Sequence, residues 1–180
     1  MKNALILHGT NNNAQGNWFQ WLKIELEKMD YQVMVPNLPD SDMPDINKYW
    51  SVLKNFNFNN ETLLIGHSSG ATMVFGILNR ILRKVKMAVS VSGFCKYGND
   101  NCQNLLKEPF NWGKIKNNAQ NFLIIWSSDD PYIKKDQTDF LSEKLNVPAI
   151  IFENQGHFNL EKNLKYKQFP ELLNLIKQNL

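Results

Sequence analysis

The sequence predicts an α/β fold in which about six mostly parallel strands carry helices on both faces. Short apolar runs alternate with amphipathic segments along the chain, and parallel strands need long connections of this kind. Two of the runs, residues 63–65 and 122–125, are apolar at every position, which is typical of strands covered on both faces. A length of 180 residues with 43% apolar residues suits one domain, residues 1–180, around a well-filled core.

The strands are predicted where short apolar runs end abruptly. The first run stops at His8-Gly9, the second stops at Pro36, and the third leads directly into a turn of glycine and serine. In chain order the six strands cover residues 4–7, 32–35, 62–65, 86–91, 121–126 and 148–152.

Five helices are predicted where apolar residues recur at helical spacing. In the second of them, Ile46, Tyr49, Trp50 and Leu53 fall on one face. The helices cover residues 18–27, 45–56, 69–82, 134–145 and 169–178. No internal repeat or domain linker interrupts this order.

The longest irregular connection covers residues 94–120. It contains Pro109, Phe110 and Trp112, so we expect it to be packed against the rest of the molecule. It follows the carboxyl end of a strand, and ligand crevices of open α/β sheets lie at that edge. We therefore expect part of it to border a binding site.

Composition and charge exclude several classes of protein. The 20 Lys and Arg residues exceed the 17 Asp and Glu residues by only three and are scattered, so nucleic acid is not an expected partner. No apolar run has the length of a membrane span, and the run before His8 is too short for a signal peptide. We expect a soluble cytoplasmic protein without a membrane partner, either a monomer or a small homo-oligomer, with Cys95 and Cys102 as free thiols. No metal-ligand or nucleotide-binding motif is present, so no metal and no cofactor are expected.

The strongest local signal for chemistry is the segment Gly66-His67-Ser68-Ser69-Gly70. It lies between an apolar strand and a helical pattern, which is the context of a nucleophile elbow. Such a turn holds its serine in a strained conformation at a helix N-terminus, where free N–H groups can stabilise an oxyanion. Ser68 is therefore the candidate nucleophile. The alternative is a structural turn that happens to contain serine.

A serine nucleophile needs a base, and the chain has three histidines. His157 follows the last strand in Gln155-Gly156-His157-Phe158, so its loop can reach the carboxyl edge of the sheet beside Ser68. His67 is expected to point away from the site, and His8 to support its own loop. His157 is the candidate base, although an isolated loop histidine is often structural.

The third catalytic group should be a carboxylate that orients the base. The fifth strand ends in Asp129-Asp130-Pro131. We favour Asp130, because the proline behind it imposes an extended conformation. Turn formation or helix capping is the alternative role for either aspartate. The chain order Ser68, Asp130, His157 is the order expected of a nucleophile elbow enzyme.

Two backbone donors are needed to bind the oxyanion. One is expected to be the N–H of Ser69, and the other should come from the loop after the first strand, with Thr10 as first choice and Asn11 as second. Four aromatic residues are candidates for the walls of the substrate pocket, with core packing as the alternative role. They are Trp18, Trp21, Phe110 and Trp112.

Over almost its whole length the chain resembles the small serine hydrolase family of the α/β-hydrolase superfamily, which has bacterial and vertebrate members. The residues that carry the resemblance are Trp18-Phe19-Gln20-Trp21, Glu25-Leu26-Glu27-Lys28, Asn37-Leu38-Pro39-Asp40, Gly66-His67-Ser68-Ser69-Gly70, Trp112 with Lys114-Ile115-Lys116, Asp129-Asp130-Pro131 and Gly156-His157-Phe158.

The resemblance implies an α/β-hydrolase fold without a large lid domain, and a triad of Ser68, Asp130 and His157. It also implies cleavage of small esters or amides, with an aminopeptidase-like activity attributed to a vertebrate member. That member is named for binding retinoblastoma protein through a Leu-x-Cys-x-Glu motif. The corresponding residues 56–60 here lack the Cys and the Glu, so no retinoblastoma-type partner is expected. The segment His8-Gly9-Thr10-Asn11 also departs from the glycine-rich loop of the vertebrate member.

The expected activity is hydrolysis of a small carboxylic ester or amide through an acyl-enzyme on Ser68. A thioesterase or an acyltransferase with the same triad is one alternative, because both pass through the same intermediate. A binding or scaffold protein that keeps the fold without catalysis is the other.

Overall fold

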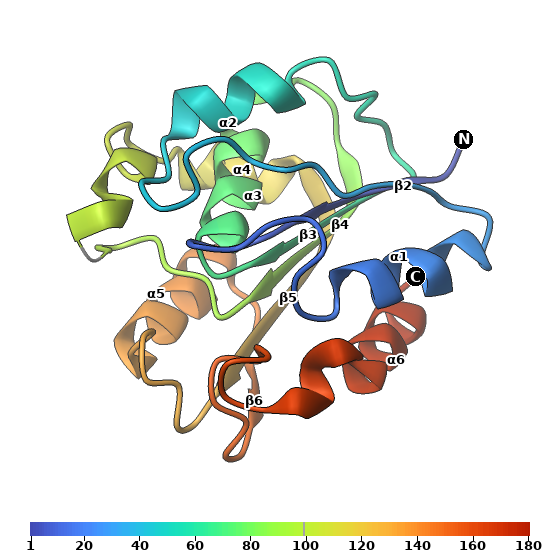
Figure 1. Ribbon diagram of the computed structural model, residues 1–180. Coiled ribbons are helices and arrows are strands. Elements are labelled where there is room, and N and C mark those ends of the chain that lie inside the picture. Colours follow the sequence, from blue (N-terminus) through green and yellow to red (C-terminus); the bar gives the residue numbers. More distant parts are fainter. Residues whose placement is uncertain (99) are drawn as a thin grey trace.

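The computed structural model describes residues 1–98 and 100–180. Six strands form one parallel sheet in the order β2-β1-β3-β4-β5-β6 (Figure 1). The strands are β1 (Asn3–Leu7), β2 (Gln32–Met34), β3 (Thr62–His67), β4 (Val85–Val91), β5 (Ala119–Ser127) and β6 (Ile150–Phe152). All six predicted strands are confirmed. Strand β5 begins two residues earlier than predicted because Ala119 still pairs with Val85 of β4.

The five predicted helices are also present, and their ends are set by local backbone geometry. They are α1 (Phe19–Glu27), α2 (Ile46–Leu53), α3 (Ser69–Arg80), α5 (Lys135–Leu145) and α6 (Pro170–Gln178). Helix α2 begins where the Asp45 side chain accepts hydrogen bonds from two backbone N–H groups. Helix α3 ends two residues before its predicted end because Ile81 is already extended, with ψ of 157°.

The connection expected to be irregular contains a short 3₁₀ helix, η1 (Asp100–Leu105), and helix α4 (Trp112–Asn117). Helix α4 has only six residues, too few to show a helical period in the sequence. It begins where the Asn111 side chain accepts a hydrogen bond from the N–H of Lys114. A second 3₁₀ helix, η2 (Leu164–Lys167), precedes α6.

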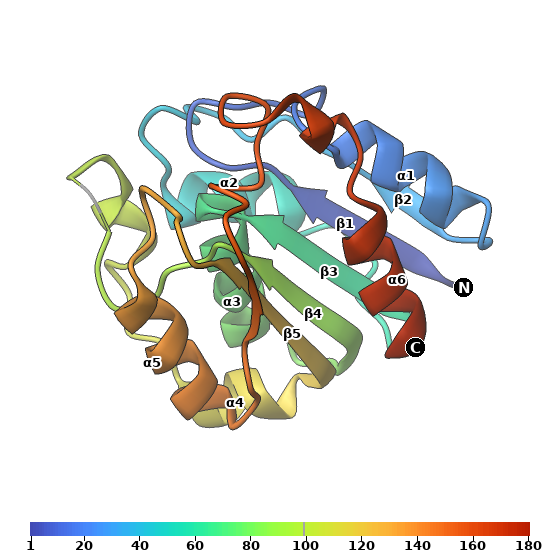
Figure 2. The same ribbon diagram turned by 90° about the horizontal axis from the view of Figure 1, so that it is seen from below.

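Helices cover both faces of the sheet. Helices α1 and α6 lie on one face, and α2, α3, α4 and α5 lie on the other (Figure 2). Each face has its own core cluster. The cluster under α1 and α6 includes Trp18 and Phe169, and the opposite cluster includes Phe75 and Leu141. The predicted α/β architecture, with six parallel strands and helices on both faces, is confirmed.

The strand order reverses between β1 and β3, and a ligand crevice is expected outside the carboxyl ends of strands at such a point. The register aligns these two ends, because Leu7 of β1 pairs with Gly66 of β3. The loops after β1, β3, β5 and β6 therefore meet at one edge of the sheet, and they carry Thr10, Ser68, Asp130 and His157.

Cys95 and Cys102 are both free and buried. Over the described residues, no helix combines the length and apolarity needed to cross a bilayer. No cluster of three or more His, Cys, Asp and Glu side chains suited to a metal ion occurs in the same part of the chain.

Candidate active site

Ser68 occupies the sharp turn between β3 and α3. Its φ of 55° and ψ of −122° lie in a region that non-glycine residues rarely adopt. The turn is tight because backbone segments pass very close to one another. A Cβ on Gly66 would lie 2.4 Å from the carbonyl oxygen of Gly70, and a Cβ on Gly70 would lie 2.4 Å from that of Leu7. The two glycines thus permit the packing that strains Ser68.

A cavity of about 760 Å³ opens at the carboxyl edge of the sheet and is lined by both Ser68 and His157. Ser68 is half-buried, and its hydroxyl has no hydrogen-bond partner among the described residues. Because Ser69 is the first residue of α3, its N–H has no acceptor within the helix. The nucleophile candidate therefore lies at a helix N-terminus and next to open space.

His157 is held by Asp130 through one ring nitrogen. Its Nδ1 lies 3.0 Å and 2.9 Å from the two carboxylate oxygens of Asp130. A carboxylate accepts hydrogen bonds, so Nδ1 is the protonated nitrogen and Nε2 of the neutral ring keeps its lone pair. Both side chains are almost fully buried, with exposed fractions of 6% for His157 and 0% for Asp130.

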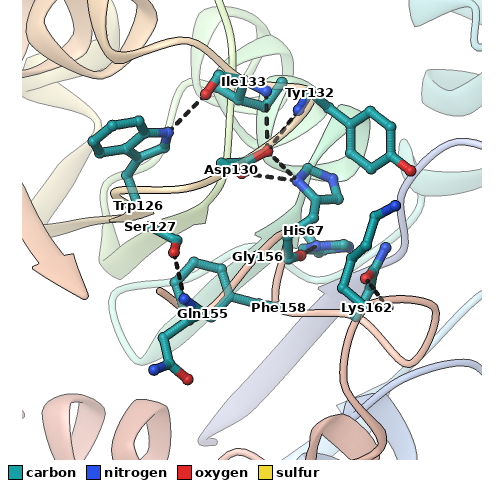
Figure 3. A network of polar contacts seen from close by, with 12 residues as sticks. His67, Trp126, Ser127, Asp130, Tyr132, Ile133, Gln155, Gly156, Phe158 and Lys162 are labelled. Atoms are coloured by element: carbon teal, nitrogen blue, oxygen red, sulfur yellow. Dashed lines mark hydrogen bonds and ion pairs between the residues drawn. The ribbon is translucent and has the colours of Figure 1, made fainter. Parts of the chain in front are cut away.

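The Asp130 carboxylate is also fixed by its own backbone. Oδ1 accepts hydrogen bonds from the N–H groups of Tyr132 and Ile133, at 2.9 Å and 3.0 Å (Figure 3). Burial by itself would raise the pKa of Asp130, but the hydrogen bond and charge of His157 and the Ile133 N–H outweigh burial and lower it. Asp130 is therefore ionised at neutral pH and can stabilise a protonated His157.

Asp129 has a different role from its neighbour. Its Oδ1 accepts hydrogen bonds from the Ser127 hydroxyl at 2.7 Å and from the Gly156 N–H at 2.8 Å. It therefore ties the end of β5 to the loop that carries His157. The sequence favoured Asp130 over Asp129, and the structure brings only Asp130 into contact with the imidazole.

The loop that carries His157 is anchored at successive backbone groups. The Gln155 N–H donates to the Ser127 hydroxyl, and the Phe158 carbonyl accepts from the Trp18 indole at 3.1 Å. The Leu160 N–H donates to the Asn17 side chain at 3.1 Å. These anchors come from β5 and from the segment before α1, so the position of His157 depends on elements far apart in the sequence.

The other two histidines are buried. His8 donates from Nδ1 to the Gly9 carbonyl and accepts the Leu38 N–H at Nε2, both at 2.9 Å, so it supports its own loop as predicted. His67 was expected to point away from the site. That expectation was wrong: His67 is among the residues that line the cavity, and its Nε2 lies 2.7 Å from the His157 carbonyl oxygen.

The loop after β1 passes directly beside the nucleophile. A Cβ on Gly9 would lie 2.9 Å from the Cβ of Ser68. The Asn11 N–H donates to the Ser41 carbonyl at 2.9 Å and is therefore occupied. No acceptor for the Thr10 N–H lies among the described residues, and Thr10 lines the cavity. Of the two residues that the sequence left open, only Thr10 keeps a free backbone donor.

Comparison with known proteins identifies the family of the chain. Residues 4–178 match the profile of the serine hydrolase family. The chain belongs to the serine hydrolase family. It is 23% identical over 177 residues to the serine hydrolase RBBP9 of Rattus norvegicus, with 96% of this chain and 91% of the relative covered. It is also 23% identical over 163 residues to YdeN of Bacillus subtilis, with 87% and 86% covered. The resemblance seen in the sequence is confirmed.

Solved structures show the same fold. The crystal structure of the ydeN gene product from B. subtilis has a TM-score of 0.92 at 21% identity, covering 99% of this chain and 98% of that one. The methylesterase MES16 from Arabidopsis has a TM-score of 0.65 at 16% identity, covering 98% and 99%.

The four aromatic residues predicted to line the pocket of this serine hydrolase do not line it, and that prediction was wrong. Trp18 is fully buried in the cluster under α1 and α6, and the partly buried Trp21 packs against the same cluster. Phe110 and Trp112 pack against each other and against the opposite cluster, with ring centroids 5.7 Å apart. These side chains have apolar surface to bury in the core, and none of them reaches the cavity.

Other aromatic residues line the cavity instead. Phe94 and Tyr97 follow the carboxyl end of β4, and Tyr132 follows that of β5. Gln137 of α5 holds the first segment in place, because its side chain donates to the Tyr97 carbonyl at 2.7 Å and accepts the N–H groups of residues 95 and 96. The position of these aromatics just after strand ends was the signal in the sequence that could have identified them.

Trp18 supports the loop of His157 rather than the substrate. Replacing it by phenylalanine keeps an aromatic ring but leaves the buried Phe158 carbonyl without its donor. We expect Trp18→Phe to lower the free energy of unfolding by about 1–3 kcal/mol, measured by urea denaturation. Trp21→Phe is the control, because the Trp21 indole donates to none of the described residues; its loss should stay below about 1 kcal/mol. Equal losses in the two variants would contradict the role given to Trp18.

Proposed function

We propose that this serine hydrolase cleaves a small carboxylic ester or amide through an acyl-enzyme on Ser68. The observation that carries the proposal is the contact between His157 Nδ1 and both carboxylate oxygens of Asp130, in a cavity that Ser68 also lines. This contact leaves the lone pair of His157 Nε2 available to take a proton. The strained turn at Ser68 supports the assignment of the nucleophile.

In the proposed mechanism the Ser68 hydroxyl gives its proton to His157 Nε2 while its oxygen attacks the substrate carbonyl carbon. Asp130 stabilises the imidazolium, and the backbone N–H groups of Ser69 and Thr10 bind the oxyanion. The imidazolium then protonates the leaving alkoxide or amine, which departs and leaves the acyl-enzyme. His157 next removes a proton from water while the water oxygen attacks the ester carbonyl. The imidazolium then gives this proton to the departing Ser68 oxygen, which releases the acid and restores the Ser68 hydroxyl and the neutral His157.

The cavity supports a small-molecule substrate with an apolar part. Its volume of about 760 Å³ is ordinary for a small-molecule site. Its lining includes aromatic residues from the segments after β4 and β5 and asparagines from the loops after β1 and β6. The aromatic residues are Phe94, Tyr97 and Tyr132, and the asparagines are Asn11, Asn12, Asn17 and Asn159. The methylesterase activity named for the structural relative MES16 also favours an ester.

Labelling with a fluorophosphonate probe tests the proposal without knowledge of the substrate. We expect one covalent adduct on the intact protein, located on Ser68 by peptide mapping, and loss of labelling in His157→Ala. Absence of an adduct on folded protein would contradict the proposal and favour a binding role. After labelling, a panel of esters, amino-acid amides and acyl thioesters distinguishes the hydrolase from a thioesterase.

We also propose that the enzyme works in a reducing compartment such as the cytoplasm. Cys95 and Cys102 are both buried and free, and free cysteines are typical of proteins kept under reducing conditions. Burial raises the pKa of both thiols, which keeps them protonated and unreactive.

A further inference from the structure

His67 is a buried titratable residue that the proposed mechanism does not use. It is the last residue of β3 and immediately precedes Ser68. The residue is only 2% exposed, and its ring lies against the rings of Trp18 and Phe19, with centroids 6.1 Å away in each case. Figure 3 shows it beside the loop that carries Gly156 and Phe158.

One hydrogen bond fixes the protonation state of His67. Its Nε2 lies 2.7 Å from the carbonyl oxygen of His157. A carbonyl oxygen only accepts hydrogen bonds, so Nε2 carries the proton and Nδ1 carries a lone pair. Nδ1 is buried and has no donor among the described residues. A buried acceptor without a partner is rare in folded proteins because it costs free energy. Donating from Nε2 to the His157 carbonyl therefore carries the cost of leaving Nδ1 unpaired.

His67 does not act as a second base. Burial, together with the neighbouring charge of His157, lowers the pKa of His67 to about 3, while the hydrogen bond to the His157 backbone and the charge of Asp130 act against this. The nearby His8 also disfavours a positive charge on His67 and so lowers the pKa of His67 further. His67 is therefore a neutral donor at every pH at which the enzyme would work.

The sheet alone does not set the distance between Ser68 and His157. Their strands, β3 and β6, are separated by β4 and β5, so the strand axes are about 14 Å apart. The His157 loop has to reach back across two strands to meet Ser68. At His157 the backbone turns sharply, because Gly156 and Phe158 on either side both have positive φ, 61° and 51°. His67 is the contact that joins this turn to the strand of Ser68.

We propose that His67 is a positioning residue. Its Nε2–H holds the backbone of His157, and since His67 is next to Ser68 in the chain, this contact sets the distance between the base His157 and the nucleophile Ser68. The inference rests on the proposed function, since it assigns a role only if Ser68 and His157 react together. The same hydrogen bond to the His157 carbonyl keeps the His67 and His157 rings close together, with their centroids 4.7 Å apart.

Nitrogen NMR of the wild-type protein with ¹⁵N-labelled histidine tests the contact directly. The chain has only 3 histidines, and His67→Gln and His157→Ala identify their signals. We expect the His67 ring to carry its proton on Nε2 and to stay neutral from about pH 5 to about pH 9. His8 should carry its proton on Nδ1, as its contacts to Gly9 and Leu38 require. A His67 ring that is protonated on Nδ1, or that titrates in this range, overturns the proposal.

Two variants of His67 separate positioning from packing. His67→Gln keeps an N–H donor near the place of Nε2, whereas His67→Leu has similar volume and no donor. We expect His67→Leu to lower kcat by about 100-fold because a small displacement of the base is costly, with KM changed by no more than about threefold. His67→Gln should retain kcat within about fivefold of wild type. Equal losses of kcat in the two folded variants would overturn the proposal.

The outcomes also separate this inference from the proposed function. The NMR result needs no substrate, so it stands or fails without the assignment of Ser68. If the fluorophosphonate probe fails to label Ser68 while the His67 signal is as expected, the proposed function is wrong and the contact is structural. If the probe labels Ser68 and His67→Leu labels at the wild-type rate, the function holds and the positioning role is overturned.

Discussion

Ser68→Ala is expected to lower kcat by about 10⁶-fold, measured with the first ester or amide that the wild-type enzyme hydrolyses. Alanine removes the only atom that can form the acyl-enzyme and leaves the remaining site unchanged. Alanine tolerates the φ of 55° at position 68 no worse than serine does, so the folded structure and the urea midpoint should change little. The loss would therefore be a loss of chemistry.

Ser128→Ala is the matched control for Ser68→Ala. Ser128 also lies at the carboxyl edge of the sheet, and its hydroxyl donates to Glu153 at 2.7 Å without lining the cavity. We expect its kcat to stay within about twofold of wild type. Wild-type turnover in pure, folded Ser68→Ala would show that the nucleophile lies elsewhere.

Asp130→Asn is expected to lower kcat by about 10⁴-fold. An asparagine at this position can present its NH₂ group to His157 Nδ1, which then becomes the acceptor, so that Nε2 carries the proton and is unable to take one from Ser68. The shape of the site is unchanged, and the loss should fall on kcat rather than on KM. Steady-state kinetics at neutral pH, with folding checked by circular dichroism, give this measurement.

Asp129→Asn is the control on the adjacent residue. The asparagine keeps a side-chain oxygen for the Ser127 hydroxyl and the Gly156 N–H that Asp129 binds. We expect kcat within about twofold of wild type. If the two results are reversed, Asp129 orients the base, and the structure-based choice between the aspartates is wrong.

The sequence predicted the architecture because parallel strands and their helices leave a strong local pattern. Runs such as residues 122–125 are apolar throughout since both faces of the sheet are covered. The turn at Ser68 was also readable, because its glycines occupy positions where a Cβ would meet backbone. Helix α4 was missed since six residues carry no helical period, and its start depends on the Asn111 cap.

The sequence did not identify the walls of the cavity. Trp18 and Trp112 were plausible as lining residues because large aromatics are common both in pockets and in cores. The composition of a segment does not show which way its side chains point. That is decided when the elements pack on the sheet. Here the start of α1 directs Trp18, the residue that precedes the helix, into the core, while the segments after β4 and β5 bring Phe94 and Tyr132 to the cavity.

By itself the sequence predicted the α/β fold, the strained serine turn and the chain order of the three candidate residues Ser68, Asp130 and His157. Only the tertiary structure showed that Asp130 and not Asp129 contacts His157, that the N–H of Asn11 is occupied while that of Thr10 has no acceptor among the described residues, and that His67 lies against the His157 carbonyl. The features predicted from the sequence depend on local patterns of apolar residues and glycines, which can be recognised from residues close together in the chain. The features that only the tertiary structure showed depend on hydrogen bonds between residues as many as 90 positions apart, and these form only when separate strands bring their loops to one edge of the sheet.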